Sequence, residues 1–230
     1  ARLFTGNYYQ LPTGRVAALN ADTPFPPIEY ALAEPNGLIA IGGDLSSQRI
    51  LAAYQQGIFP WFNEGEPILW WSPNPRFVLF PAHLKVSATM KQVIKRQTFV
   101  FKTNTAFDQV IANCKKIKRA GQVGTWITPD VEKAYNILHE KGIAHSAEAW
   151  SNGKLVGGLY GIKMGKLFFG ESMFSSESNA SKFAFISYVK QLEAEGIVLI
   201  DCQVYTEHLE SLGAAMISRD RFKELLYTYR

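Results

Sequence analysis

The stretch from residue 144 to residue 174 constrains the fold of this chain most, because two turn signals divide it into three short apolar runs. Asn152-Gly153 and Met164-Gly165 are dipeptides of the kind that close tight β-hairpins. Three runs in succession predict an antiparallel meander over residues 144–150, 154–163 and 166–174. We expect this meander to form the antiparallel part of a larger sheet.

Helices are predicted before and after the meander from their end signals. Thr128-Pro129 begins one, because threonine caps helices and proline suits the first helical position, and Gly142 ends it. Thr105 and Asp108 have the spacing of a capping pair for a second. This second helix is predicted over residues 105–119. Further helices are predicted over residues 47–56, 87–96, 180–196 and 219–226, with strands over residues 99–102 and 198–204.

The glycine pair Gly42-Gly43 is interpreted as tight backbone packing. It lacks both the GxxxxGK[ST] and the GxGxxG spacing of phosphate-binding loops. Asp44 follows the pair and is expected to cap the helix over residues 47–56, which Gly57 ends.

The order of elements predicts an α/β (α+β) protein, with a mixed, largely antiparallel sheet flanked by helices. Residues 1–33 are expected to be irregular because prolines cluster there. Residues 59–81 hold five prolines and three tryptophans, which indicates aromatic-rich loop and short strand. We therefore divide the chain into a small N-terminal domain, residues 1–75, and a larger domain, residues 76–230.

The composition excludes several classes of protein. With 47% hydrophobic and 19% charged residues among 230, the chain is expected to be globular rather than disordered. It shows no secretion signal, and no apolar run approaches the roughly 18 residues that span a bilayer. Cys114 and Cys202 form no CxxC pair and lack nearby histidines at ligand spacing, so no metal site or disulfide is expected. We expect a cytoplasmic protein, and a monomer because nothing signals an interface.

Positive charge is concentrated in residues 85–121. This segment holds nine of the 24 Lys and Arg residues and one acidic residue, Asp108, whereas the rest of the chain is net negative. A basic stripe of this kind is typical of a surface that binds a polyanion. A solvated helix face would show the same pattern, so the charge alone leaves both interpretations open.

Three polar residues stand out against apolar surroundings. Asp201 and Gln203 share one face of a strand that is expected to be largely covered, and an unpaired buried polar group costs about 1–3 kcal/mol. Glu171 lies among phenylalanines and a methionine in FFGESMFS. Such groups are candidates for binding or catalysis. A structural hydrogen-bond pair, or a carboxylate satisfied by a neighbouring Arg or Lys, is the alternative.

Histidine and tryptophan also allow two interpretations each. His208 is not far from Asp201 in the sequence, but no nucleophile-elbow pattern supports a catalytic triad, which favours a structural histidine. Tryptophans lie near predicted loops at positions 61, 70, 71 and 126. They either belong to the core or stack on a nucleobase, a contact worth roughly 1–3 kcal/mol per base.

Eight segments, taken in order, resemble a known family. They are EPNGLIAIGGDLS, YQQGIFPWF, ILWWSPNPR, GTWIT, GGLYG, FFGESMFS, NASK and LIDCQV. Each segment is short, but their order and spacing over residues 31–213 are similar to those of the leucyl/phenylalanyl-tRNA–protein transferases.

The resemblance implies a small N-terminal domain and a C-terminal domain with the GCN5-related N-acetyltransferase fold. It implies transfer of Leu, Phe or, less well, Met from aminoacyl-tRNA to a protein that begins with Arg or Lys. The product would enter the bacterial N-end rule degradation route. The reaction would use no ATP, metal or coenzyme.

The resemblance also implies which residues form the site. Asp201, Gln203 and Glu171 match the reaction centre, and Trp61 and Trp126 match positions near the tRNA 3′ adenosine or the acceptor. The other expected substrate-binding residues, most of them lining an apolar pocket for the transferred side chain, are Tyr54, Leu159, Phe168, Met173, Phe185, Tyr188 and Ile200. The residues expected to contact tRNA are Arg76, Lys91, Lys95, Arg96, Lys115 and Lys118.

The mechanism stays open between three hypotheses. Asp201 and Gln203 are expected to hold the incoming amine, with Asp201 as one candidate for removing its proton. Glu171 is expected instead to read the cationic side chain of the acceptor, and the substrate's ribose hydroxyl is a second candidate base. An acetyl-CoA-dependent enzyme is a rival, but residues 177–183 lack the glycines of a pyrophosphate loop. A non-catalytic RNA-binding module is another rival, which would leave the three polar residues without a purpose.

Overall fold

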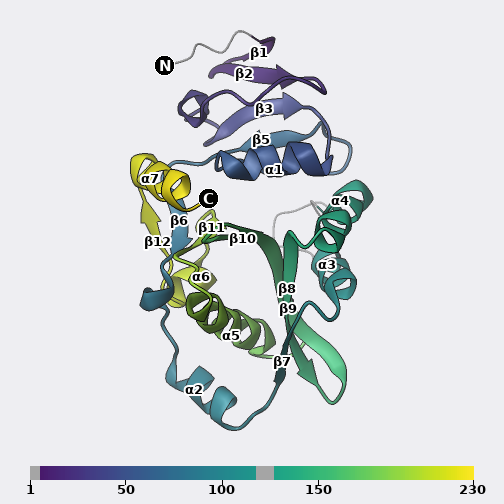
Figure 1. Cartoon of the computed structure of the whole chain (residues 1–230), viewed down its shortest axis with the longest axis vertical. Helices are drawn as coiled ribbons and strands as arrows, with labels where there is room; N and C mark the ends of the chain where they lie inside the picture. Colours follow the sequence, from purple (N-terminus) through teal and green to yellow (C-terminus); the bar gives the residue numbers. More distant parts are fainter. Residues whose placement is uncertain (1–5, 118–126) are drawn as a thin grey trace.

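The computed structural model describes residues 6–117 and 127–230, whose strands form two sheets, one above the other in Figure 1. Among these residues the N-terminal sheet has the order β1-β2-β3-β5-β4, and the larger sheet has the order β12-β6-β11-β10-β9-β8-β7. The last strand of the first sheet ends at Trp71 and the second sheet begins at Arg76. Residues 72–75 therefore link the two sheets.

The N-terminal sheet contains β1 (Tyr8–Leu11), β2 (Gly14–Leu19), β3 (Leu38–Gly42), β4 (Phe59–Pro60) and β5 (Leu69–Trp71). The expectation that residues 1–33 are irregular was wrong, because β1 and β2 form an antiparallel hairpin. The residues of β1 are exposed on both faces except for Leu11, so no alternation of apolar and polar residues marked this strand in the sequence. The helix α1 (Ser47–Gln55) lies between this sheet and the larger domain (Figure 1).

The larger sheet contains β6 (Arg76–Leu79), β7 (Val100–Thr103), β8 (Ala144–Ser151), β9 (Lys154–Met164), β10 (Leu167–Ser175), β11 (Leu199–Gln203) and β12 (Ala215–Ile217). Its described pairs are antiparallel except for β10 with β11, which confirms the predicted mixed, largely antiparallel sheet. The predicted meander is β8, β9 and β10. Its first turn has Asn152 and Gly153 in the left-handed region, at φ 51° and 73°, as a tight hairpin requires.

Helices pack on both faces of the larger sheet. They are α2 (Ala88–Lys95), α3 (Phe107–Lys116), α4 (Pro129–Glu140), α5 (Ala180–Ala194), α6 (Glu207–Ser211) and α7 (Arg219–Tyr229). Phe168 and Phe169, adjacent on β10, point to opposite faces and belong to different cores. Phe169 packs in a core that α3 and α4 share with Tyr54 of the N-terminal domain, whereas Phe168 packs in the core under α5. One core thus joins the two domains.

The predicted helix starts were confirmed at several points, with two corrections. Thr128 caps α4 by accepting a hydrogen bond from the Val131 backbone N–H at 3.3 Å. Asp44 does not cap α1. The cap is Ser46, which accepts from the backbone N–H of Arg49 at 3.2 Å, while Asp44 accepts from the Ser46 N–H at 3.0 Å.

The predicted capping pair of α3 was wrong. Thr105 does not accept from the first turn of α3. Its own N–H and hydroxyl, together with the N–H of Ala106, donate to the carboxylate of Glu148 on β8, with the two N–H bonds at 3.1 Å. Glu148 is fully buried, and it also accepts from Ser146 and Trp150. The carboxylate of Glu148, which lies on β8, therefore takes the place that the sequence pattern assigned to Asp108.

The parallel pairing of β10 with β11 is short and positions the site. It runs from Leu167–Leu199 to Phe169–Asp201, after which the two strands separate. The residues just beyond this point on the two strands are Glu171 and Gln203.

Within the described ranges, no helix is both long enough and apolar enough to cross a membrane.

A candidate active site between two cavities

Two cavities meet where β10 and β11 separate. The first, about 450 Å³, lies beside α5 and α6 and has a mostly apolar lining, and the second, about 290 Å³, lies against the N-terminal domain. Glu171, Gln203 and Val204 line both. The structure therefore brings together two of the three predicted reaction-centre residues at the junction of two spaces that differ in character.

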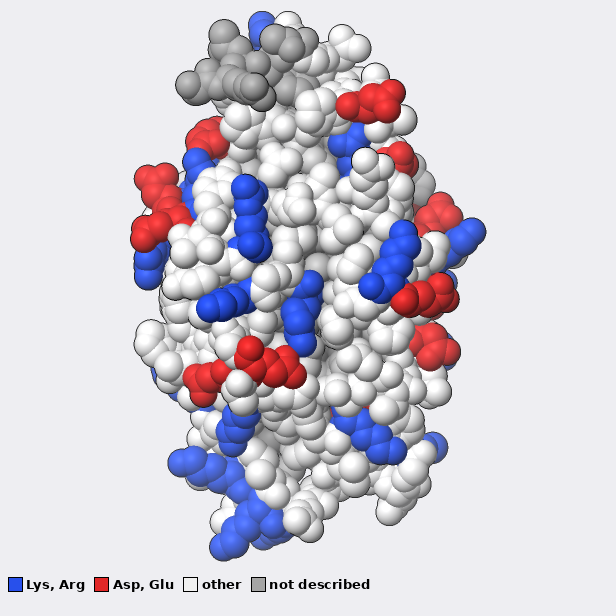
Figure 2. Space-filling view, in the orientation of Figure 1, with Lys and Arg blue, Asp and Glu red and all other residues white. Residues whose placement is uncertain are grey.

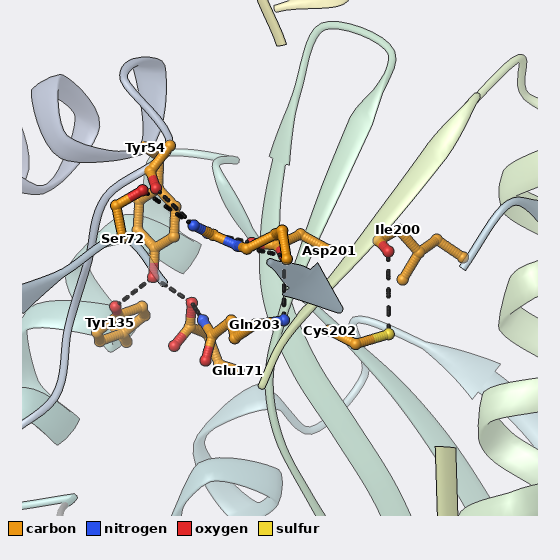
Figure 3. A network of polar contacts seen from close by, with 10 residues as sticks. Tyr54, Ser72, Tyr135, Glu171, Ile200, Asp201, Cys202 and Gln203 are labelled. Atoms are coloured by element: carbon orange, nitrogen blue, oxygen red, sulfur yellow. Dashed lines mark hydrogen bonds and ion pairs between the residues drawn. The ribbon is translucent and has the colours of Figure 1, made fainter. Parts of the chain in front are cut away.

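Glu171 is held at this junction by hydrogen bonds from two domains. Its Oε1 accepts from the hydroxyl of Tyr54 on α1 and from Nε2 of Gln203 at 3.0 Å. The Tyr54 hydroxyl lies 2.7 Å from that of Tyr135 on α4, so a chain of three polar groups runs from α4 through α1 to β10 (Figure 3). β10 has a bulge between Gly170 and Ser172, which places Glu171 at the irregularity.

The environment of Glu171 favours its protonated form. Burial raises the pKa of its carboxyl group from 4.5 to about 8, against the opposing effect of the hydrogen bonds from Tyr54 and Gln203. The Asp201 charge adds to the rise and the Arg76 charge opposes it. Burial also raises the pKa of both Tyr54 and Tyr135, so these hydroxyls keep their protons at neutral pH.

Asp201, the third predicted reaction-centre residue, forms a buried ion pair with Arg76. Arg76 Nε donates to Asp201 Oδ1 at 2.9 Å, and Arg76 Nη2 donates to Oδ2 at 2.7 Å. Arg76 Nη1 donates to the carbonyl of Gly57 at 2.9 Å, and the guanidinium lies over the rings of Phe59 and Phe222. Both oxygens of Asp201 are therefore occupied by a fixed cation.

The expected contact of Arg76 with tRNA was wrong, because this residue is only 1% exposed and its guanidinium points into the protein. Its side chain cannot reach a phosphate on the surface. No signal in the sequence near Arg76 could have shown this, because its partner Asp201 lies on a strand much later in the chain. The sequence analysis did consider a carboxylate that is paired with a neighbouring Arg. It named Glu171, and not Asp201, as that carboxylate.

Gln203 occupies a strained backbone position that the ion pair supports. Its φ is 68°, and the Val204 N–H donates to the carbonyl of Cys202 at 2.8 Å, which defines a γ-turn centred on Gln203. The Gln203 N–H donates to Asp201 Oδ1 at 3.0 Å. A non-glycine residue with positive φ costs of order 1–3 kcal/mol and persists only when its surroundings hold it. Arg76 and Asp201 thus fix the turn that directs the Gln203 amide to Glu171.

The first cavity is lined by most of the residues expected for an amino-acid pocket. The lining residues that the sequence predicted are Leu159, Phe168, Met173, Phe185 and Ile200. Tyr188 does not line the cavity. It packs edge-on against Phe168, with ring centroids 5.2 Å apart, and so supports a residue of the cavity wall from behind. The sequence interpretation missed Cys202 and Leu209, which also line the cavity.

The second cavity is lined by aromatic rings. Phe59, Trp61 and Trp71 line it together with Pro73 and Asn36. Trp61 and Trp71 meet edge-on with centroids 6.4 Å apart, and the Trp71 indole donates to the Trp61 carbonyl at 2.7 Å. The tryptophan at position 70 is instead fully buried core. The predicted residues Trp126 and Lys118 lie outside the described residues.

The remaining basic residues predicted to contact tRNA stay at or near the surface. Lys91 and Lys95 on α2 and Arg96 after it are exposed. Lys115 on α3 is half-buried and forms an ion pair with Glu132 at 3.4 Å. Figure 2 shows Lys and Arg side chains gathered at the lower end of the molecule, where Figure 1 places α2.

The structure gives no support to a nucleophilic triad at His208. His208 and Cys202 both line the first cavity, but burial raises the pKa of the Cys202 thiol well above its usual range, so the sulfur keeps its proton. Among the described residues, no group of three or more His, Cys, Asp or Glu side chains is placed to hold a metal ion.

Comparison with known proteins identifies the family. The model of the leucyl/phenylalanyl-tRNA protein transferase family matches residues 78–227, and the model of the N-terminal domain of the same transferases matches residues 43–74. The chain belongs to the leucyl/phenylalanyl-tRNA–protein transferase family. Leu159, Glu171 and Gln203 fall within the first match, and Tyr54 and Trp61 fall within the second.

Individual members of the family are close in sequence. The leucyl/phenylalanyl-tRNA–protein transferase of Nitrosomonas eutropha is 56% identical over 211 residues, which covers 92% of this chain and 90% of the relative. That of Chromobacterium violaceum is 54% identical over 204 residues, covering 89% and 87%.

Two solved structures that match this member of the family are distant from it in sequence. L-PGS from Bacillus licheniformis matches 82% of this chain and 65% of its own, with 13% identity and a TM-score of 0.41. A GCN5-related N-acetyltransferase-like protein from Streptococcus suis matches 63% and 57%, with 14% identity and a TM-score of 0.37.

Proposed function

We propose that this chain transfers Leu, Phe or Met from aminoacyl-tRNA to the N-terminal amine of a protein that begins with Arg or Lys. Family membership supports the reaction class. The observation that carries the proposal is the meeting of an apolar cavity and an aromatic cavity at Glu171 and Gln203. An aminoacyl-tRNA whose amino-acid side chain fills one cavity and whose terminal base fills the other would place its ester bond at such a junction.

The first cavity suits the side chain of the transferred amino acid. Leu159, Phe168 and Ile200 give it an apolar wall, and its volume of about 450 Å³ is ample for Leu, Phe or Met. Burial of such a side chain is worth roughly 1.5–3 kcal/mol, whereas a charged side chain would be buried without a partner. The cavity therefore selects apolar donors, and selection among them depends on shape.

The second cavity suits the terminal adenosine of the tRNA. Trp61 and Trp71 offer ring faces and edges, and stacking of a base on an aromatic side chain is worth roughly 1–3 kcal/mol. With the base there and the aminoacyl side chain in the first cavity, the ester that joins them would lie beside Glu171 and Gln203. The acceptor amine would approach the same point.

The chemistry requires positioning more than activation. An ester donor and an amide product make the reaction favourable without ATP. An α-amino group has a pKa of about 7.7–8.0, so roughly a tenth of it is neutral at pH 7. Fixing the amine against the ester carbonyl can contribute several kcal/mol by itself. Gln203 would orient the amine, and Asp201 would hold Gln203 through the turn rather than take a proton.

The surface around α2 suits the tRNA acceptor stem. Lys91, Lys95 and Arg96 are exposed there, and phosphate contacts of this kind are independent of sequence and weaken with salt. We further propose that the enzyme acts as a cytoplasmic monomer. Its product would carry a new N-terminal residue that marks it for degradation by the bacterial N-end rule route.

The test is transfer of radiolabelled leucine from Leu-tRNA to a peptide that begins with Arg, without ATP. There are two controls. One replaces the acceptor with a peptide that begins with Ala, and the other replaces Leu-tRNA with radiolabelled acetyl-CoA. Label on the Arg peptide alone supports the proposal. An absence of label, with tRNA retained in a filter-binding assay, would contradict it and leave an RNA-binding protein.

A further inference from the structure

The two oxygens of Glu171 have different surroundings. Oε1 accepts hydrogen bonds from the Tyr54 hydroxyl and from Gln203 Nε2 at 3.0 Å. Among the described residues no hydrogen bond is made to Oε2, and Glu171 lines both cavities at their junction. The carboxylate thus has one oxygen fixed by the protein and a second that a bound substrate can reach.

We propose that Glu171 is the proton acceptor of the transfer, and that Tyr54 and Tyr135 are positioning residues that hold it for this step. This inference rests on the function proposed above. The amine nitrogen forms a bond to the ester carbonyl carbon, and its surplus proton passes to Oε2 of Glu171. The bond from that carbon to the ribose oxygen then breaks, and Glu171 returns the proton to the departing oxygen. An amine and an ester become an amide and an alcohol, with no net gain or loss of protons.

The neighbouring groups favour Glu171 over Asp201 for this role. Asp201 has both oxygens bonded to Arg76, and Oδ1 also accepts from the Gln203 N–H. Burial raises the pKa of Glu171 to about 8, close to that of an α-amino group at about 7.7–8.0. A base works best when its pKa lies near the operating pH, because it is then free to accept the proton and able to release it.

Among the described residues, the charged and titratable groups that surround Glu171 come from four elements. Tyr54 is on α1, Tyr135 on α4, Asp201 on β11 and Arg76 on β6. The single hydroxyl proton of Tyr54 goes to Glu171, so the Tyr135 hydroxyl donates to Tyr54 across 2.7 Å. These donations stabilise the carboxylate over the acid. Removal of either hydroxyl should therefore raise the pKa of Glu171, and removal of Tyr54 should raise it more.

The first test is Glu171→Gln, which keeps the shape of the side chain and removes the base. We expect kcat to fall roughly 10²–10⁴-fold, with the KM for an Arg-initial peptide changed only a few-fold. Circular dichroism and thermal unfolding would confirm that the variant folds. A kcat that is retained while KM for the peptide rises would overturn the proposal, and would assign Glu171 to reading the acceptor's cationic side chain.

The second test compares Tyr54→Phe and Tyr135→Phe with wild type in single-turnover transfer, between about pH 6 and about pH 9, with saturating peptide. We expect the rising limb of the rate to move to higher pH, further for Tyr54→Phe. The rate at pH 7 should fall roughly tenfold for each pH unit by which the limb moves. The α-amino group of the acceptor peptide titrates in the same pH range, but its contribution to the pH profile is the same for wild type and for every variant.

The matched control is Tyr229→Phe, which removes a hydroxyl on α7 away from the two cavities, and its limb should coincide with that of wild type. Lower rates with an unmoved limb in Tyr54→Phe and Tyr135→Phe would overturn the positioning role. A wild-type protein that transfers no leucine would refute the proposed function itself, which separates that failure from failure of this inference.

Discussion

The two carboxylates of the site, the buried Asp201 and the half-buried Glu171, differ in the groups that bind them. Asp201 is paired with Arg76 through two hydrogen bonds of 2.9 and 2.7 Å, which hold it in place. Among the described residues, Glu171 has no cation as a hydrogen-bond partner, and its partners there are a tyrosine hydroxyl and a glutamine amide. The contrast indicates that Asp201, which has an ion-pair partner, fixes the geometry of the site. Glu171, which has none among the described residues, is free to gain or lose a proton.

The largest effect should come from breaking the Arg76 pair. Arg76→Met leaves the charge of Asp201 buried without a partner, which we expect to lower the free energy of unfolding by about 3–5 kcal/mol. Urea denaturation measures this loss. Arg221→Met removes the exposed pair with Glu224 and is the matched control, with an expected loss of at most about 1 kcal/mol. Equal losses in the two variants would mean that Asp201 is not held as described.

A smaller effect of opposite sign should come from Glu171→Gln. Because the folded pKa of Glu171 is raised from 4.5 to about 8, ionisation in the unfolded state destabilises the wild-type protein as pH rises from 4.5, until the effect levels off near 8. The variant lacks this cost, so its melting temperature should exceed that of wild type by several degrees at about pH 9, and by much less at about pH 5, at roughly 2–4 °C per kcal/mol. A stability advantage that shrinks with rising pH would contradict the raised pKa.

The smallest effect should come from the turn that joins the two carboxylates. Gln203→Gly removes a side chain from a backbone position at φ 68° and should be more stable than Gln203→Ala by roughly 1 kcal/mol, as thermal unfolding can measure. Both variants lose the amide that donates to Glu171, so both should lose transfer activity. If Gln203→Ala were the more stable of the two, the strain assigned to this turn would be absent.

The sequence singled out candidate site residues more readily than it revealed the partners of those residues. Asp201, Gln203 and Glu171 could be singled out because each is a polar group in an apolar stretch. Which of them has a charged partner could not be read, because Arg76 joins Asp201 across two different strands of the sheet. Tyr135 gave no signal at all, since a tyrosine on the buried face of a helix is expected in any core.

The fold could be predicted wherever the local signals agreed with the tertiary structure. The Asn152-Gly153 turn and the Thr128 cap depend on neighbours in sequence, and both were confirmed. The start of α3 was mispredicted because Glu148 of β8, far away in the sequence, binds the backbone N–H groups of Thr105 and Ala106 that precede the helix. The hairpin of β1 and β2 was missed because its exposed residues carry no apolar pattern.

The hydrogen bond from Tyr54 to Glu171 has a consequence for engineering. Tyr54 belongs to the helix between the two sheets, and the core around it contains residues of both domains. We therefore expect that the part of the chain that forms the larger sheet cannot be transferred to another protein without α1. A chimera that exchanges the N-terminal domain must carry compatible versions of α1, α4 and β10 together, or the carboxylate at the junction loses the partner that orients it.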